Sequence, residues 1–193
     1  MTETQGQAGE AGDAGESNAC EECGFTDDLS MDEAVAAIGR FAKRYRAPLT
    51  RFLPGEDGDA VVRARPAPGV WSALEYAAHV RDVFGWYDEW VRRSLDEDGF
   101  VVDAPGPDEA ADLGRYGELA PQEVAAALEA NASRLAATLA AVPEGSWGRT
   151  HVRRGHRRSV LFTARRAVHE GNHHLLDIGR GMRAVRDGLK GAT

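Results

Sequence analysis

Cysteine is scarce in this sequence, and long apolar runs and an excess of positive charge are absent. Only two of the 193 residues are cysteines, too few for the disulfide framework of a small secreted domain. No run approaches the ~18 apolar residues of a membrane-spanning helix, so no membrane span is expected. The acidic start has neither the basic nor the apolar region of a signal peptide. We therefore expect a cytoplasmic protein that does not contact the membrane.

Negative charge is concentrated near the N-terminus. Ten of the 31 acidic residues lie within residues 1–35, which contain no Lys or Arg, so the other 21 nearly balance the 23 basic residues of the remaining chain. A nearly neutral domain lacks the electrostatic footprint of nucleic-acid binding. Residues 1–19 are small or polar after the initiator, and we expect them to form a disordered acidic tail. An arm, residues 20–29, contains both cysteines.

Four amphipathic segments predict an all-α fold, a four-helix bundle over residues 30–182. The first two helices begin with capping boxes, in which Ser30 pairs with Glu33 and Ser72 pairs with Glu75. Apolar residues recur at helical spacing, and no strand-like alternation is visible. The four stripes fall within residues 35–52, 74–91, 124–142 and 161–178.

Proline and glycine mark the expected interruptions and ends of these helices. Pro48 should kink the first helix or end it early. A short helix is expected after Pro107, and Pro121 suits the first turn of the third long helix. Gly179 or Gly181 can end the last helix. Residues 183–193 would then be a C-terminal tail.

Histidines are clustered in the last helix, in the stretch HEGNHH. His169 and His173 are four residues apart and share a helix face, where two neutral imidazoles can bind one metal. His79 lies on a polar streak of the second helix and could complete a three-histidine site with one open position. The alternative is that these are partly buried histidines hydrogen-bonded to their neighbours.

The same stretch fits the metalloprotease pattern H-E-x-x-H. That activity needs a third ligand, usually downstream, and the 20 residues after His173 offer little. The extended pattern of metzincins is absent, and no strand signal indicates a peptide-binding sheet. The sequence therefore argues against a protease.

The chain resembles the DinB superfamily of small metal-binding four-helix bundles in two stretches. They are WSALEYAAHVRDV in the second helix and HEGNHHLLDIG in the last. The resemblance covers about residues 30–182. It implies that one divalent metal is held by His79, His169 and His173. Zinc is the expected ion, and nickel, iron and manganese also suit three imidazoles.

The resemblance predicts the fold of this chain more specifically than it predicts the reaction. Some actinobacterial members are similar to transferases and isomerases that depend on the thiol mycothiol, and the Ala-, Arg- and Gly-rich composition suits such a source. A metal with an open position can activate a thiol or a water. The leading interpretation is thus a thiol-dependent enzyme. A metal-dependent hydrolase and a non-catalytic metal- or ligand-binding protein are the alternatives.

Three carboxylates near the histidines have candidate roles. Glu170 could act as a general base in a hydrolase, or it could be a surface carboxylate, since it points about 100° away from His169. Asp177 lies four residues after His173 and could orient a ligand, or it could pair with an arginine. Glu75 precedes His79 by four residues and could support it, although its capping role already accounts for it.

The two cysteines form a C-x-x-C motif ahead of the first helix. Cys20 and Cys23 could join His151 and His156 in a second, structural zinc site. They could also form a redox pair or remain plain thiols, although a redox pair normally follows a strand.

We expect the substrate to be a small molecule, bound with a thiol by a monomer or a homodimer. Tyr76, Trp86 and Trp90 share the face of His79 and would line its pocket, or they are simply core residues. Several arginines precede or enter the last helix, where they could hold an anionic substrate or form a solvated face: Arg153, Arg154, Arg157, Arg158, Arg165 and Arg166.

Overall fold

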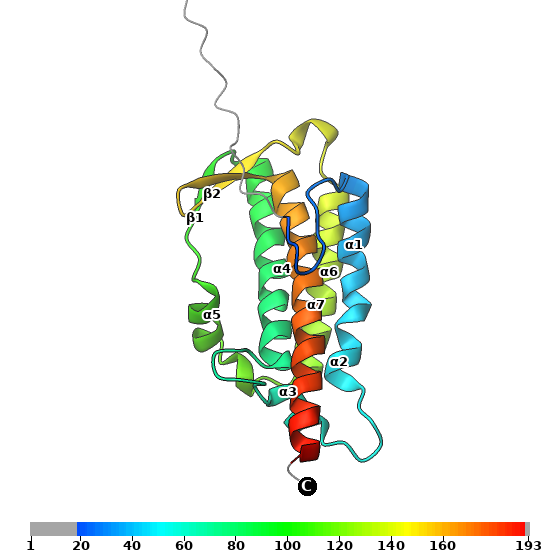
Figure 1. The fold of residues 1–193 in the computed structure, drawn as a ribbon. Helices are drawn as coiled ribbons and strands as arrows, with labels where there is room; N and C mark the ends of the chain where they lie inside the picture. Colours follow the sequence, from blue (N-terminus) through cyan, green and yellow to red (C-terminus); the bar gives the residue numbers. More distant parts are fainter. Residues whose placement is uncertain (1–18, 192–193) are drawn as a thin grey trace, which may run out of the picture.

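The computed structural model describes residues 19–191, and its long helices pack side by side (Figure 1). The predicted disordered tail lies outside the described residues, apart from Ala19. The long helices are α1 (Met31–Arg44), α4 (Ala73–Asp96), α6 (Pro121–Ala140) and α7 (Val160–Gly191). Short helices are α2 (Arg46–Thr50), α3 (Gly58–Arg63) and α5 (Pro107–Leu113), with 3₁₀ turns η1 (Tyr116–Glu118) and η2 (Glu144–Ser146), and the strands are β1 (Phe100–Val102), β2 (Thr150–Arg153) and β3 (His156–Ser159).

The bundle places α7 between α1 and α4. Helices α1 and α4 each pack against both α6 and α7, so α6 and α7 occupy opposite corners. The apolar faces of the four helices meet in one core that includes Phe41, Phe84, Leu128 and Leu135. No helix of the described chain combines the length and apolar character needed to span a membrane.

Local sequence signals set the helix starts as predicted. Ser30 and Ser72 accept hydrogen bonds from the backbone N–H groups of Glu33 and Glu75, whose carboxylates accept from the two serine N–H groups in return. The first helix is interrupted at Tyr45, ahead of Pro48, so the expected early end is confirmed. Helices α1 and α4 therefore begin at the two capping boxes.

The last helix is longer than predicted. It continues past Gly179 and Gly181 to Gly191, so the expected C-terminal tail from residue 183 is largely helical. Met182 and Val185 are buried and extend the apolar stripe beyond Ile178. Two glycines cost about 1 kcal/mol each inside a helix, and burial of two large side chains offsets this.

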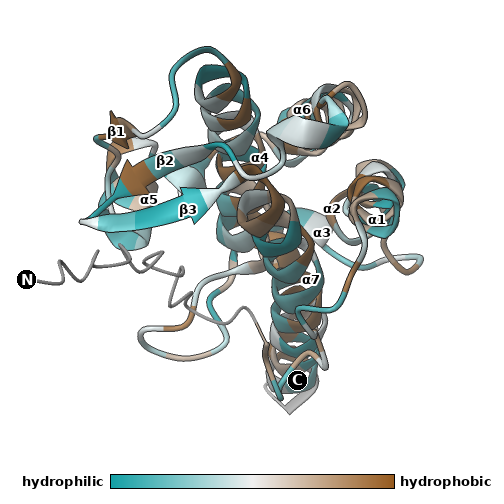
Figure 2. Ribbon diagram, turned by 90° about the horizontal axis from the view of Figure 1, so that it is seen from above, coloured by the Kyte–Doolittle hydropathy of each residue, from teal (hydrophilic) through white to brown (hydrophobic). Residues whose placement is uncertain are grey.

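A three-stranded sheet, which the sequence analysis did not predict, lies beside α4 (Figure 2). Strand β1 pairs with β2 in parallel, and β2 pairs with β3 in a hairpin. The hairpin loop is Arg154–Gly155, and both residues have positive φ, 52° and 80°, as a two-residue hairpin turn requires. Strands of three or four residues contain too few alternations to produce a clear sequence signal.

Candidate metal centre

Helix α7 carries two pairs of side chains of the types that can bind metals, the members of each pair four residues apart. His169 and His173 form one pair, and Glu170 and His174 form the other. The two pairs are offset by one residue and are therefore rotated by about 100° around the helix. They face different neighbours, so the bundle decides which pair meets His79 on α4.

The structure brings His79 to Glu170 and His174. Nε2 of His79 lies 3.4 Å from Oε2 of Glu170, and Nε2 of His174 lies 3.2 Å from the same oxygen. The ligand atoms of the three residues all lie within 4.8 Å of one another. Two imidazoles and a carboxylate thus converge between α4 and α7.

Neighbouring charges hold this cluster in place. Oε1 of Glu170 lies 2.6 Å from Nη2 of Arg166, one turn earlier on α7. Burial opposes ionisation of Glu170, but hydrogen bonds from His174 and His79 and the charge of Arg166 keep its pKa well below the usual range. The carboxylate is therefore anionic although the residue is only 7% exposed.

Asp177 orients His174 from the opposite side. Nδ1 of His174 donates to Oδ2 of Asp177 at 2.8 Å. Burial disfavours the imidazolium, yet the hydrogen bonds to Asp177 and Glu170 raise the pKa of His174 to about 9. Asp177 thus acts on a histidine of the cluster, as predicted for a carboxylate that orients a ligand, but its hydrogen-bond partner is His174.

The residues of this cluster fit a divalent metal ion. With Nδ1–H committed to Asp177, Nε2 of His174 can approach the Glu170 carboxylate only with a proton or a metal between them. Tetrahedral ligands about 2.1 Å from zinc are separated by about 3.4 Å, which matches the two contacts of Glu170. Two histidines and a glutamate are also a known ligand set of catalytic zinc.

The predicted three-histidine set is divided between two clusters. His79 joins the Glu170–His174 cluster, whereas His169 and His173 lie with Cys20 and Cys23. The physical reason is helix phase, because the i,i+4 pair that faces α4 begins one residue after His169. Glu170, for which a surface position was the main alternative, is buried.

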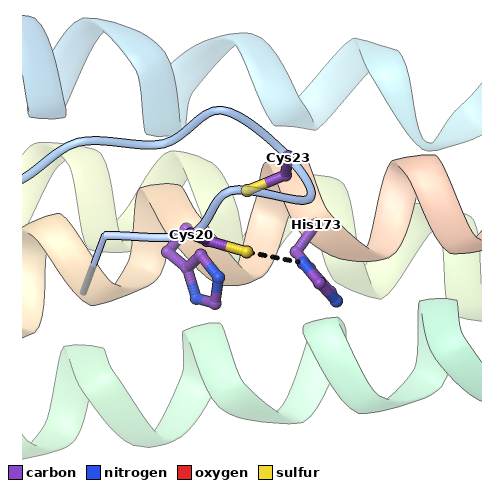
Figure 3. A group of neighbouring side chains, drawn as sticks. Cys20, Cys23 and His173 are labelled. Carbon is purple, nitrogen blue, oxygen red and sulfur yellow. Dashed lines mark hydrogen bonds between the residues drawn. The ribbon is translucent and has the colours of Figure 1, made fainter. Parts of the chain in front are cut away.

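The cysteines meet the other pair of α7 (Figure 3). The arm lies along α7 and directs both thiols toward it, with Sγ of Cys20 3.5 Å from Nδ1 of His173. The backbone N–H of Cys23 lowers the pKa of the Cys20 thiol. The predicted partners are elsewhere: His151 packs between Trp90 and Phe100, and His156 is exposed at the start of β3. Those two histidines belong to the strand hairpin, whose position the sequence did not reveal.

A cavity of about 650 Å³ opens beside both clusters. Trp86, Trp90, Phe162 and Trp71 are among its lining residues. Tyr76 is not among its lining residues and instead stacks on His174, with ring centroids 5.2 Å apart. The carboxylate of Glu75 accepts hydrogen bonds from the backbone N–H of Ser72 and from the side chain of Arg65. The first of these is the capping role that its position allowed.

The lining of this cavity is rich in positive charge. Four arginines line it, and three of them come from the β2–β3 hairpin, which the sequence did not reveal. Two of their guanidinium groups lie over aromatic rings of the same lining, Arg153 over Trp90 at 5.4 Å and Arg158 over Phe162 at 5.6 Å, and such a mixed lining suits a small organic anion. The lining arginines are Arg153, Arg154, Arg158 and Arg166.

Fold and site together define a four-helix bundle with a candidate metal centre between two of its helices. The family model of the DinB superfamily matches residues 43–178, and the chain belongs to this superfamily. The predicted family and bundle fold are thus confirmed.

The bundle is also similar to a solved structure, that of YfiT from Bacillus subtilis, described as a probable metal-dependent hydrolase with an unusual four-helix bundle topology. The match has a TM-score of 0.71 and 16% identity, and covers 83% of this chain and 91% of that chain. At this identity the likeness concerns the fold. No curated protein sequence matches the chain.

Sequence signals for the observed grouping were present but ambiguous. E-x-x-x-H at Glu170–His174 and H-x-x-x-H at His169–His173 have the same period, and both fit a metal site. C-x2-C with H-x3–5-H is a zinc-binding spacing, and it fits the H-x3-H pair His169 and His173 in α7 as well as the H-x4-H pair His151 and His156. Choosing between them required the helix phase.

Proposed function

We propose that the chain is a metal-dependent enzyme that acts on a small organic anion, with the ion held by His79, Glu170 and His174. The observation that carries this proposal is the convergence of two Nε2 atoms on one buried carboxylate oxygen, 3.4 and 3.2 Å away, at the wall of a cavity. Two imidazoles and a carboxylate suit zinc first, and iron, manganese or nickel as well. This assignment replaces His169 and His173 of the sequence prediction with residues one position later.

A divalent ion at this position would supply a Lewis acid that lowers the pKa of a thiol or a water. The residues of the chain fix its surroundings. Asp177 holds the ring of His174, and Arg166 holds one oxygen of Glu170 so that the other points at the two imidazoles. Glu170 is therefore proposed as a ligand, and its earlier role as a general base becomes secondary.

For the reaction, we propose transfer or isomerisation assisted by a low-molecular-weight thiol, with mycothiol as the candidate. Two observations support a small organic anion as the substrate. The cavity volume lies within the range of sites for ligands of drug size. The arginines of its lining can hold a carboxylate while the aromatic rings contact the apolar part of the substrate. Hydrolysis is the second candidate, favoured by the similarity of the fold to YfiT.

Metal analysis of ligand variants tests the site. His79→Ala and His174→Ala should each lower the metal content by one equivalent per chain, and the double variant should lower it no further, because both residues hold the same ion. His156→Ala, an exposed histidine, is the control and should keep the full content. Unchanged metal content in His79→Ala would refute the site.

The same measurement separates the structural grouping from a three-histidine site. If His79 and His169 held one ion, the His79→Ala and His169→Ala losses would not add. In the proposed grouping, which rests on the two sets of neighbouring ligand atoms, His79 and His169 hold different ions, so any metal loss caused by His169→Ala should add to that of His79→Ala.

A turnover assay separates the two reactions. The thiol proposal predicts that mycothiol is required for conversion of an anionic substrate, and that His79→Ala abolishes conversion. Conversion at the same rate without any thiol would select the hydrolase.

A further inference from the structure

We propose that Cys20, Cys23, His169 and His173 form a second metal site, a closed zinc site that fastens the N-terminal arm to α7. The sulfur and nitrogen ligand atoms of these four residues all lie within 4.8 Å of one another. They come from the arm and from α7, about 150 positions apart in the sequence, and Figure 3 shows Cys20, Cys23 and His173 close together. This site is separate from the His79 cluster and does not depend on the reaction proposed above.

The arm is shaped so that its thiols share one side. Cys20 donates its backbone N–H to the carbonyl of Phe25 at 2.9 Å, which closes a tight turn around the C-x-x-C motif. Gly24 follows the second cysteine with φ of +70°, a conformation that side chains rarely adopt. Phe25 is 6% exposed and packs on the ring of His169, with centroids 5.8 Å apart. The apolar anchor thus places the turn over the histidine pair.

The two histidines have ring nitrogens available to bind a cation on the side where the thiols lie. Both ring nitrogens of His169 are buried and have no hydrogen-bond partner in the described part of the chain. A buried imidazole without partners is costly, and a bound ion would satisfy one nitrogen. Nδ1 of His173 faces Cys20, while its Nε2 lies 3.6 Å from Glu22 and 3.7 Å from Asp177. Carboxylates behind a metal-binding imidazole orient it in this way in known sites.

Distances and charge select zinc. Sulfur about 2.3 Å and nitrogen about 2.1 Å from tetrahedral zinc are separated by about 3.6 Å, and the Cys20–His173 contact is 3.5 Å. Two thiolates neutralise a divalent ion, and their softness favours zinc over magnesium, calcium or manganese. Four protein ligands leave no open position, so the site is structural. Its spacing, C-x2-C followed by H-x3-H, is of the kind zinc modules use.

The proposed zinc ion would immobilise two side chains that line the cavity. His169 and His173 also line the cavity, next to His174. A zinc ion that fixes their rings would fix the outer wall of the proposed active site, and the ion pair between Glu22 and Arg180 holds the arm on the same helix. The arm is then held against α7 by the proposed zinc ion and by this ion pair.

Cobalt substitution of the full chain tests the proposal directly, because only a thiolate ligand gives thiolate-to-cobalt charge-transfer absorption. The metal-free protein titrated with Co²⁺ should show this band, and its final intensity should correspond to one thiolate-bound Co²⁺ per chain. Cys20→Ser/Cys23→Ser and His169→Ala/His173→Ala should lose the band or alter it strongly. His79→Ala should keep it at full intensity, and so should His156→Ala, which also excludes the grouping with the hairpin histidine.

Thiol alkylation provides a second readout, independent of folding of the variants. In the wild-type chain, one equivalent of zinc should slow modification of both thiols at least tenfold, and a chelator should restore it. Absence of the cobalt band in the wild type would overturn the proposal, as would a band that survives both double variants or zinc that leaves alkylation rates unchanged. A failure of the His79 site, by contrast, would leave all these signals intact, so the two proposals fail separately.

Discussion

Nε2 of His79 on α4 lies 3.4 Å from Oε2 of Glu170 on α7, a contact between residues 91 positions apart. It joins the two stretches that carry the family resemblance. His174, one turn further along α7, approaches the same oxygen and completes the cluster. The neighbouring pair, His169 and His173, lies with the cysteines of the arm. One helix thereby provides ligands for two candidate metal sites.

The close approach of α7 to α1 should make Gly171 intolerant of a side chain. A Cβ atom there would lie 2.4 Å from the ring of Phe41, which is 1% exposed and cannot move aside. Gly171→Ala should therefore lower the free energy of unfolding by about 1–3 kcal/mol, despite the better helix propensity of alanine. Urea denaturation of the metal-free protein measures this change.

Gly179→Ala is the matched control for that substitution. It lies in the same helix, and nothing lies within 4 Å of its added Cβ. It should raise the free energy of unfolding by up to about 1 kcal/mol. Equal effects of the two substitutions would contradict the packing of α7 on Phe41.

The arginines that line the cavity should provide most of its affinity for anions. Arg154 is exposed, and Arg158 is partly exposed with its guanidinium 5.6 Å from the Phe162 ring, so glutamine is used at Arg158 to keep part of the stem while the charge is removed. Arg154→Ala/Arg158→Gln should weaken binding of inorganic phosphate to the metal-free protein by about tenfold, or about 1.4 kcal/mol. Isothermal titration calorimetry gives the two dissociation constants. Arg183 is exposed near the far end of α7, and Arg183→Ala is the control, which should bind phosphate as tightly as the wild type. An equal loss of phosphate affinity in this control would show that only net charge matters.

Acid should destabilise the fold through His151. Burial, with the charges of Arg158 and Arg153, lowers the pKa of His151 from 6.5 to about 4. The unfolded chain therefore binds a proton more readily than the folded chain. The stability from a neutral His151 is complete above pH ~6.5, and it is lost as pH falls toward 4, on the order of 3 kcal/mol in total.

His151→Gln should remove this part of the acid sensitivity. The difference in unfolding free energy between pH 7 and pH 4 should shrink relative to the wild type, whatever the stability of the variant at pH 7. Denaturant unfolding at both pH values gives that difference. His156→Gln should leave it unchanged, because that ring is exposed. An identical pH dependence in His151→Gln and wild type would count against the burial of His151.

Much of the fold was predictable because its signals are local. Capping boxes at Ser30 and Ser72 and the four apolar stripes depend on residues within one or two turns, and they predicted the helices and the bundle. The end of α7 was not predictable from Gly179 or Gly181. Burial of Met182 and Val185 by other parts of the chain outweighed the local cost of glycine.

The sequence by itself determined the helices, the family and the stretches that contain the candidate ligands. Only the tertiary structure decided how those ligands are grouped. Glu170 and His174 meet His79 because the packing of α7 between α1 and α4 sets the rotation of that helix, and a one-residue change in phase moves a side chain by about 100°. Cys20 and Cys23 meet α7 because Phe25 anchors the arm there. Both outcomes depend on contacts between distant segments, which helical periodicity does not encode.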